Sequence, residues 1–206
     1  VRLRFMNWLI SKYTDMATYT HFAKQPDVLK HLILCEVLKN ETPQIYVETN
    51  SACAIYPMTQ TPEQQYGIYH FLEKADEVPS LKDSIYYQLE SGEMAKGNYL
   101  GSPALAMNVL GKQAKRFVFF DLEKSALENV GTYAKQIELS ASVEIHHADS
   151  SRGTIELLPS HILFHPYRSL RNRQERRFWS NLSRCPDTGY PIRNEVFIMV
   201  WIHDRR

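Results

Sequence analysis

The chain has 206 residues, of which 44% are hydrophobic and 12% aromatic. This composition is sufficient to build a full hydrophobic core, and the length fits one domain better than two. No apolar run reaches the roughly 18 residues of a membrane span, and three unevenly spaced cysteines make neither a disulfide framework nor a zinc site. We therefore expect a cytoplasmic protein in a reducing compartment, without a membrane segment or a signal peptide.

Charge is unevenly distributed along the chain, although Lys and Arg total 24 against 23 Asp and Glu. The segment 166–206 contains nine arginines and four acidic residues, whereas the preceding 165 residues contain 15 basic and 19 acidic ones. A basic segment after an acidic body suggests an anionic partner. A solvated helix face explains the same arginines equally well.

Hydrophobic periodicity predicts strands that alternate with helices. The first helix is expected from a capping Asp27 to about Asn40, with an apolar stripe of helical period. Alternating elements of this kind form βαβ units, and therefore a parallel sheet with helices on both faces. The further elements are a strand at 44–48, helices at 62–75 and 80–89, a loop at 98–103 that opens a helix through 104–107, a strand at 116–121, a helix at 125–137, strands at 143–147 and 161–164, a helix at 170–182 and a strand at 196–201.

Acidic residues follow two of the predicted strands. Ligands of parallel sheets bind beyond the C-terminal ends of the strands, which is where Asp121 and Asp149 stand. A carboxylate offers two acceptor oxygens at a fixed spacing, so Asp121 suits a ribose diol and Asp149 suits an adenine amino group. Acids also end strands simply because the chain has reached water, so neither residue alone establishes a ligand site.

Three motifs in a fixed order resemble a known family. Residues 27–31 read Asp-Val-Leu-Lys-His, residues 46–56 read Tyr-Val-Glu-Thr-Asn-Ser-Ala-Cys-Ala-Ile-Tyr, and residues 99–103 read Tyr-Leu-Gly-Ser-Pro. Together they resemble the bacterial large-subunit ribosomal RNA adenine-N6 methyltransferase J family, whose members were earlier described as proteins for using external DNA as a nutrient. The resemblance implies a three-layer, Rossmann-like α/β fold of the class I S-adenosylmethionine-dependent methyltransferases.

The resemblance also implies how the chain is organised and what it acts on. It implies one domain over residues 1–206, with a helical insertion at about 57–98 that contacts RNA and a basic C-terminal segment. The implied reaction moves a methyl group from S-adenosylmethionine to N6 of an adenine. The implied partner is ribosomal RNA or another single-stranded nucleic acid.

Seven positions would contact the methyl donor if the family's roles carry over. Asn50 stands where the family has a histidine, Asp121 replaces a glutamate with the same charge, and Ser150 replaces a glycine. The implied donor contacts are Lys30, His31, Asn50, Ser102, Asp121, Asp149 and Ser150.

The loop after the first predicted strand departs from the family pattern. The family's loop is rich in glycine because the backbone must approach the donor closely. Here the corresponding positions are Ala52 and Ala54. Because alanine adds a methyl group and resists a positive φ, we expect this loop to be shifted or closed.

The catalytic motif also departs from the family. The family's Asp-Pro-Pro-Tyr holds the target amino group with its acid and a proline carbonyl, and its tyrosine stacks on the flipped base. This chain has Phe164, His165, Pro166 and Tyr167 instead. Pro166 and Tyr167 can keep their roles, but a neutral imidazole replaces the carboxylate. The sequence therefore leaves two interpretations: an rRNA methyltransferase with altered catalysis, or a non-catalytic nucleic-acid-binding descendant, linked to the use of external DNA.

Overall fold

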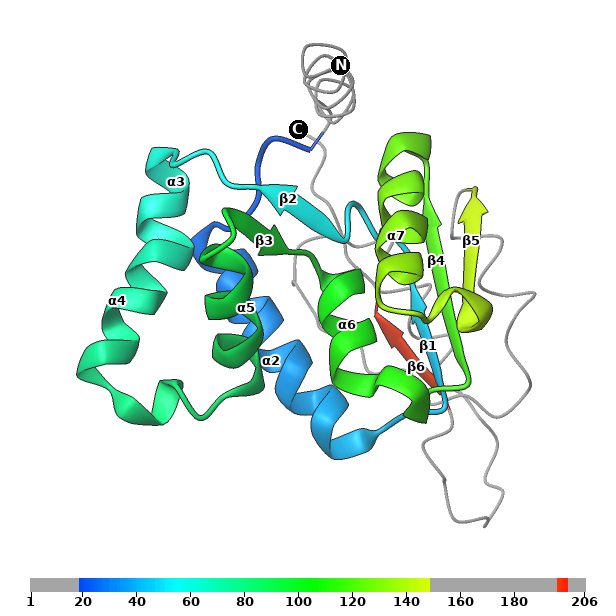
Figure 1. Cartoon of the computed structure of the whole chain (residues 1–206), viewed down its shortest axis with the longest axis horizontal. Helices are drawn as coiled ribbons and strands as arrows, with labels where there is room; N and C mark the ends of the chain where they lie inside the picture. Colours follow the sequence, from blue (N-terminus) through cyan, green and yellow to red (C-terminus); the bar gives the residue numbers. More distant parts are fainter. Residues whose placement is uncertain (1–18, 149–195, 200–206) are drawn as a thin grey trace, which may run out of the picture.

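A parallel sheet forms the centre of the protein. The computed structural model describes residues 19–148 and the strand at 196–199. Strands β1 (Ile45–Glu48), β4 (Arg116–Asp121), β5 (Val143–His147) and β6 (Val196–Met199) lie in the spatial order β5-β4-β1-β6, all parallel (Figure 1). The chain winds outward from β1 to β4 and β5, and then returns to the other side of β1. Such a reversal creates a crevice at the C-terminal ends of the strands, and ligands of α/β sheets bind there.

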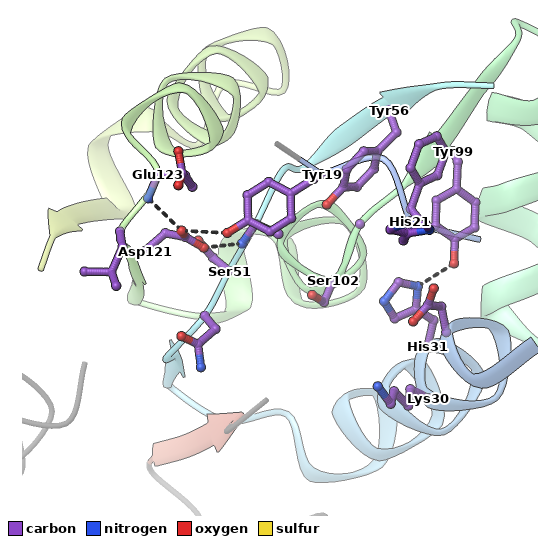
Figure 2. Close-up of a pocket in the computed structure, with 16 residues that line it drawn as sticks. Tyr19, His21, Lys30, His31, Ser51, Tyr56, Tyr99, Ser102, Asp121 and Glu123 are labelled. Atoms are coloured by element: carbon purple, nitrogen blue, oxygen red, sulfur yellow. Dashed lines mark hydrogen bonds between the residues drawn. The ribbon is translucent and has the colours of Figure 1, made fainter. Parts of the chain in front are cut away.

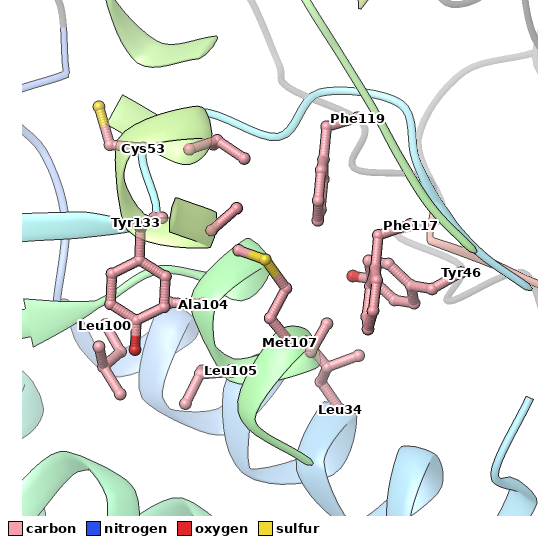
Figure 3. Packing of buried hydrophobic residues seen from close by; sticks show 14 of the residues in the cluster. Leu34, Tyr46, Cys53, Leu100, Ala104, Leu105, Met107, Phe117, Phe119 and Tyr133 are labelled. Carbon is pink, nitrogen blue, oxygen red and sulfur yellow. The ribbon is translucent and has the colours of Figure 1, made fainter. Parts of the chain in front are cut away.

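Helices pack against this sheet and against one another. Helix α7 (Lys124–Gln136) packs on β4 and β5, and α6 (Ser102–Leu110) lies between α7 and α2 (Gln25–Glu41) (Figure 1). Figure 3 shows Phe117 and Phe119 of β4 directed toward Met107 of α6, all three fully buried. The described residues therefore form a mixed α/β fold with a parallel sheet, compatible with a Rossmann-like arrangement.

A two-stranded antiparallel ribbon leads out of the sheet domain into a helical lobe. Strand β2 (Ile55–Pro57) pairs with β3 (Asn98–Leu100). Residues 58–97 between them, here called the helical insertion, lie to one side of the sheet (Figure 1). The insertion contains α3 (Pro62–Gln64), the π-helix η1 (Gln65–Tyr69), α4 (His70–Glu77), the 3-10 helix η2 (Pro79–Leu81) and α5 (Ile85–Met94).

Local chemistry explains where the helices of the insertion begin and what holds them together. The hydroxyl of Ser84 accepts a hydrogen bond from the Tyr87 amide (3.2 Å) and so caps α5. The rings of Phe71 and Tyr86, 5.3 Å apart, form the core between α4 and α5. Tyr66 differs from these aromatic neighbours, because 78% of it is exposed.

Most of the predicted elements are confirmed, but the helix predicted at 80–89 is shifted, because it begins at Ile85 after the Ser84 cap and ends at Met94. The strands at 116–121 and 143–147 are confirmed at both ends. Helix α2 begins at Gln25, so the prediction of Asp27 as the cap was wrong. Asp27 is the third residue of the helix, and its side chain accepts a hydrogen bond from the amide of the capping residue, Lys24 (3.2 Å). The predicted loop at 98–103 is also wrong in part, because Asn98–Leu100 form β3.

Part of the prediction lies beyond what the structure describes. Of the predicted strand at 196–201, residues 196–199 are confirmed as β6 beside β1, and residues 200–201 lie outside the described residues. The predicted strand at 161–164 and helix at 170–182 lie outside the described residues. Within the described part of the chain, no helix has both the length and the apolar character needed to cross a membrane.

Candidate functional site

A cavity of about 300 Å³ lies at the C-terminal ends of β1 and β4 (Figure 2). Residues 19–22, helix α2, the loop after β1, the start of α6 and the end of β4 all contribute to its walls. Five predicted donor contacts line this cavity: Lys30, His31, Asn50, Ser102 and Asp121. The other predicted site residues, Asp149, Ser150, His165, Pro166 and Tyr167, lie outside the described residues.

Asp121 is the most constrained acid of the cavity. Its Oδ1 accepts hydrogen bonds from the Tyr19 hydroxyl (2.8 Å) and the Glu123 amide (2.9 Å), and its Oδ2 accepts one from the Ala52 amide (2.8 Å). The side chain is only 3% exposed. Because a carboxylate has about four lone-pair sites, Asp121 can accept one further hydrogen bond from a ligand.

Hydrogen bonds to two side chains hold the loop after β1 in place at the cavity wall. Ala52 adopts a positive φ of 52°, a conformation that is unfavourable for a residue with a side chain. Its amide donates to Asp121 (2.8 Å), and the amides of Ala54 and Ile55 both donate to the side-chain oxygen of Asn129 (2.9 and 3.1 Å). Side chains of β4 and α7 therefore hold the loop at the cavity wall, whereas its expected displacement from the family's loop stays a prediction.

A buried carboxylate fixes Ser102 at the start of α6. The Ser102 hydroxyl donates to Glu48 Oε1, and the Tyr46 hydroxyl donates to Glu48 Oε2 (3.0 Å). Glu48 and Tyr46 are both fully buried, and the burial of Tyr46 together with the neighbouring Glu48 raises the pKa of Tyr46. With its hydrogen committed to Glu48, Ser102 is left as a hydrogen-bond acceptor toward the cavity.

His31 contributes a neutral imidazole. Its Nδ1 lies 2.9 Å from the Tyr99 hydroxyl, which in turn lies 3.4 Å from the Tyr86 hydroxyl. Burial, together with the positive charge of Lys30, lowers the pKa of His31 to about 3. Near neutral pH this side chain is therefore uncharged and supplies a hydrogen-bonding nitrogen rather than a positive charge.

Aromatic side chains form a wall that sequence reasoning did not identify. The ring of Phe22 stacks on Tyr56 at 4.5 Å and on Tyr99 at 6.0 Å, and all three residues line the cavity together with Tyr19. Tyr56 and Tyr99 belong to the motifs at 46–56 and 99–103, so the motifs could have identified them. Tyr19 and Phe22 carry no comparable signal, because they reach the cavity only through the tertiary fold.

The chemistry available at the cavity is hydrogen bonding and charge rather than nucleophilic attack by a thiol. Cys53 is buried, and burial together with the nearby Asp121 raises its pKa to about 12. Among the described residues no cluster of His, Cys, Asp and Glu has the arrangement of a metal site. The arrangement suits a polar ligand with an aromatic part that can lie against Phe22 and Tyr56.

Glu90 lies behind the cavity and links the helical insertion to β3. Its Oε2 accepts a hydrogen bond from the Leu100 amide (3.2 Å), whereas its Oε1 has no partner in the described part of the chain. Burial raises the pKa of this carboxyl well above its usual range. The folded protein therefore holds Glu90 protonated over a pH range in which the unfolded chain ionises it.

Replacing Glu90 by glutamine should remove a pH-dependent loss of stability. As the pH rises above about 4.5, the unfolded chain ionises Glu90 and the folded state loses about 1.4 kcal/mol per pH unit, up to the folded pKa. Glu90→Gln should thus leave the free energy of unfolding unchanged near pH 4.5 and raise it near neutral pH. Urea unfolding at both pH values measures this, with the exposed Glu73→Gln as control. A variant no more stable than the parent at neutral pH contradicts the prediction.

Comparison with solved structures finds proteins of similar fold. One of them is the crystal structure of protein LPL1258 from Legionella pneumophila str. Philadelphia 1, which is described under the family model DUF519. The two structures agree with a TM-score of 0.58 and 26% sequence identity over 68% of this chain, and the match covers 53% of the Legionella protein. The chain thus spans about half the length of that relative. No family model matches the sequence, and no curated protein matches it.

Proposed function

We propose that the cavity binds S-adenosylmethionine and that the protein has inherited methyl transfer to N6 of an adenine in large-subunit ribosomal RNA. The observation that carries this proposal is the convergence of Lys30, His31, Asn50, Ser102 and Asp121 on one cavity. These residues come from α2, the loop after β1, α6 and β4. The location at the C-terminal edge of a parallel sheet, beside the reversal of strand order, supports the proposal independently of the motifs.

The polar groups of the cavity fit such a donor. The hydroxyl of Ser51 is buried at the cavity wall and has no hydrogen-bond partner in the described part of the chain, which is unfavourable unless a ligand or water supplies one. Asp121 would accept a ribose hydroxyl and Lys30 would face the donor's carboxylate. The aromatic wall of Phe22 and Tyr56 offers a surface for a purine or an apolar chain.

The methyl donor supplies an electrophilic methyl group, and this chain's residues would hold the acceptor adenine against it. In the proposed reaction Tyr167 stacks on the base and Pro166 presents a carbonyl to the amino group. His165, which replaces the family's acid, offers only a neutral acceptor. Losing a charge-assisted hydrogen bond costs about 1.5–3 kcal/mol, or about one to two powers of ten in rate. We therefore propose that catalysis is weak and that base binding persists.

Restoring the carboxylate tests the catalytic part of the proposal. His165→Asp should raise the rate of methyl transfer by about ten- to a hundredfold, because a charged acceptor again orients the amino hydrogens. The assay follows labelled methyl from S-adenosylmethionine into unmodified large-subunit RNA, with His203→Asp as a control for added charge. Turnover by the parent at ordinary enzyme rates, or an equal rate in the variant, would contradict the weak-catalysis proposal.

One sequence feature favours a second candidate function. Because His165 stands where the family has its acid, the chain also fits a nucleic-acid-binding descendant that retains the fold without catalysis, including a role in the use of external DNA. The arginines of residues 168–177 would then hold the phosphates of a single strand. Binding of RNA without transfer in both the parent and the His165→Asp variant would favour this second function.

A further inference from the structure

The helical insertion touches the rest of the chain at a contact that only glycine permits. Gly67 interrupts the helix within η1 with a non-helical φ of −97° and ψ of −109°. A Cβ atom at this position would lie 2.0 Å from the carbonyl oxygen of Ala23 and 2.7–2.8 Å from backbone carbons of Lys24. The next amide, of Ile68, donates to the same Ala23 oxygen (3.1 Å). Backbone therefore packs directly on backbone.

The contacted segment continues into the wall of the cavity. Tyr19, His21 and Phe22 line the cavity immediately before Ala23, and α2 begins immediately after Lys24 (Figure 2). Ala23 is fully buried and has a positive φ of 60°, so this point of the chain is held in a conformation that alanine does not favour. A shift at Ala23 would move the aromatic wall on one side and the helix that carries Lys30 on the other.

A second tie joins the insertion to the same segment. Oε2 of Glu63 lies 3.1 Å from Nδ1 of His21 and 3.5 Å from the Lys24 ammonium. Both contacts lie at exposed side chains, so each contributes little to stability. Their position matters more than their strength, because they tie residues 21–24 to a second point of the insertion besides Gly67.

We propose that Gly67 is a positioning residue of the cavity, through which the helical insertion sets the affinity of the ligand site. The contact at Gly67 fixes the carbonyl of Ala23 and thereby the wall formed by Tyr19, His21 and Phe22. An event that moves η1, such as the binding of a partner to the insertion, then changes ligand affinity without touching the cavity. The nature of the ligand rests on the function proposed above, whereas the coupling itself rests on the contact.

The test compares two glycine-to-alanine substitutions in the same insertion. Gly67→Ala forces η1 and residues 23–24 apart, whereas Gly92→Ala adds a methyl group that meets no atom within 4 Å. The probe is S-adenosylhomocysteine, titrated calorimetrically at a low temperature at which circular dichroism shows both variants folded. The dissociation constant should rise at least about tenfold in Gly67→Ala and stay within about twofold of the parent in Gly92→Ala.

Hydrogen exchange without ligand separates this inference from the proposed function. In Gly67→Ala, amides of residues 19–24 should exchange faster than in the parent, while those of α6 stay unchanged. If the parent fails to bind the probe but exchange rises at residues 19–24, the function fails and the positioning contact stands. If amides 19–24 of Gly67→Ala exchange as slowly as in the parent, the inference is overturned. It is also overturned if the parent binds the probe and Gly67→Ala binds it with the same affinity.

A surface variant covers the case in which Gly67→Ala does not fold. Glu63→Ala removes the tie to His21 and Lys24 from an exposed position, so the fold should persist. We expect amide hydrogen exchange at residues 19–24 to become faster. Affinity for the probe should fall only about two- to fivefold, because contacts between exposed charged side chains are weak. Exchange and affinity equal to those of the parent would then overturn the inference.

Discussion

Gly101→Ala is expected to lower the free energy of unfolding by about 3 kcal/mol, one of the largest effects of any single methyl group in the protein. A Cβ atom at Gly101 would lie 2.0 Å from the carbonyl oxygen of Cys53 and 3.1 Å from the ring of Tyr56. The Gly101 amide also donates to Ala54 (2.8 Å). Accommodating alanine therefore separates the start of α6 from the loop after β1, where the two meet at the cavity.

Urea unfolding of Gly101→Ala beside Gly92→Ala gives a direct measurement. Gly92 lies in α5 with open space around its α-carbon, so alanine there should stabilise the protein by about 0.5–1 kcal/mol through helix propensity alone. The two substitutions should thus have opposite signs. A Gly101→Ala protein as stable as the parent would mean that the close approach of α6 to the loop does not exist.

Asp121→Asn is expected to weaken ligand binding by about ten- to a hundredfold, which corresponds to about 1.5–3 kcal/mol for a lost charge-assisted hydrogen bond. The carboxylate accepts from Tyr19, Ala52 and Glu123 on its two oxygens. An amide group turns one of these oxygens into a donor, so at least one of the three partners then faces another donor. If the Ala52 amide is released, the positive φ of that residue loses its main support.

Two further variants show whether the effect of Asp121→Asn comes from the lost charge at this position. Asp121→Glu keeps the charge and should retain more affinity than the amide variant, because the family resemblance places a glutamate at this position. Asp83→Asn, on the exposed side of the insertion, should leave affinity for S-adenosylhomocysteine unchanged. Equal affinities of the parent and Asp121→Asn, measured by calorimetric titration, would remove Asp121 from the ligand site.

Sequence patterns predicted the elements whose residues form a continuous apolar run or an apolar stripe of helical period. The four apolar residues from Phe117 to Phe120 followed by Asp121 gave the exact limits of β4, because a fully buried strand needs a continuous apolar run. Helix α7 was predicted to within one residue for a similar reason, since its apolar stripe follows the helical period. The motifs located Asn50 and Ser102, the position at the end of a predicted strand located Asp121, and the fold brings all three to one cavity.

Features that depend on distant contacts could not be predicted from the chain alone. Strand β3 forms only because Tyr99 pairs with Tyr56, 43 residues earlier, and three residues are too few to show a period. Glu48 ends a predicted strand without any signal of its own, yet it is the buried partner of Ser102 and Tyr46. Similarly, Asp121 and Asn129 accept hydrogen bonds from the amides of the alanine-containing loop, which no local pattern reveals.

The central claim is that the cavity at the ends of β1 and β4 binds S-adenosylmethionine. Calorimetric titration of the unmodified protein with S-adenosylmethionine and with S-adenosylhomocysteine tests it most directly. We predict one ligand bound per chain for both compounds, with a melting temperature that rises with ligand concentration, because a ligand that binds only the native state stabilises it. The absence of binding heat and of any thermal shift at saturating concentrations of both compounds would contradict this prediction.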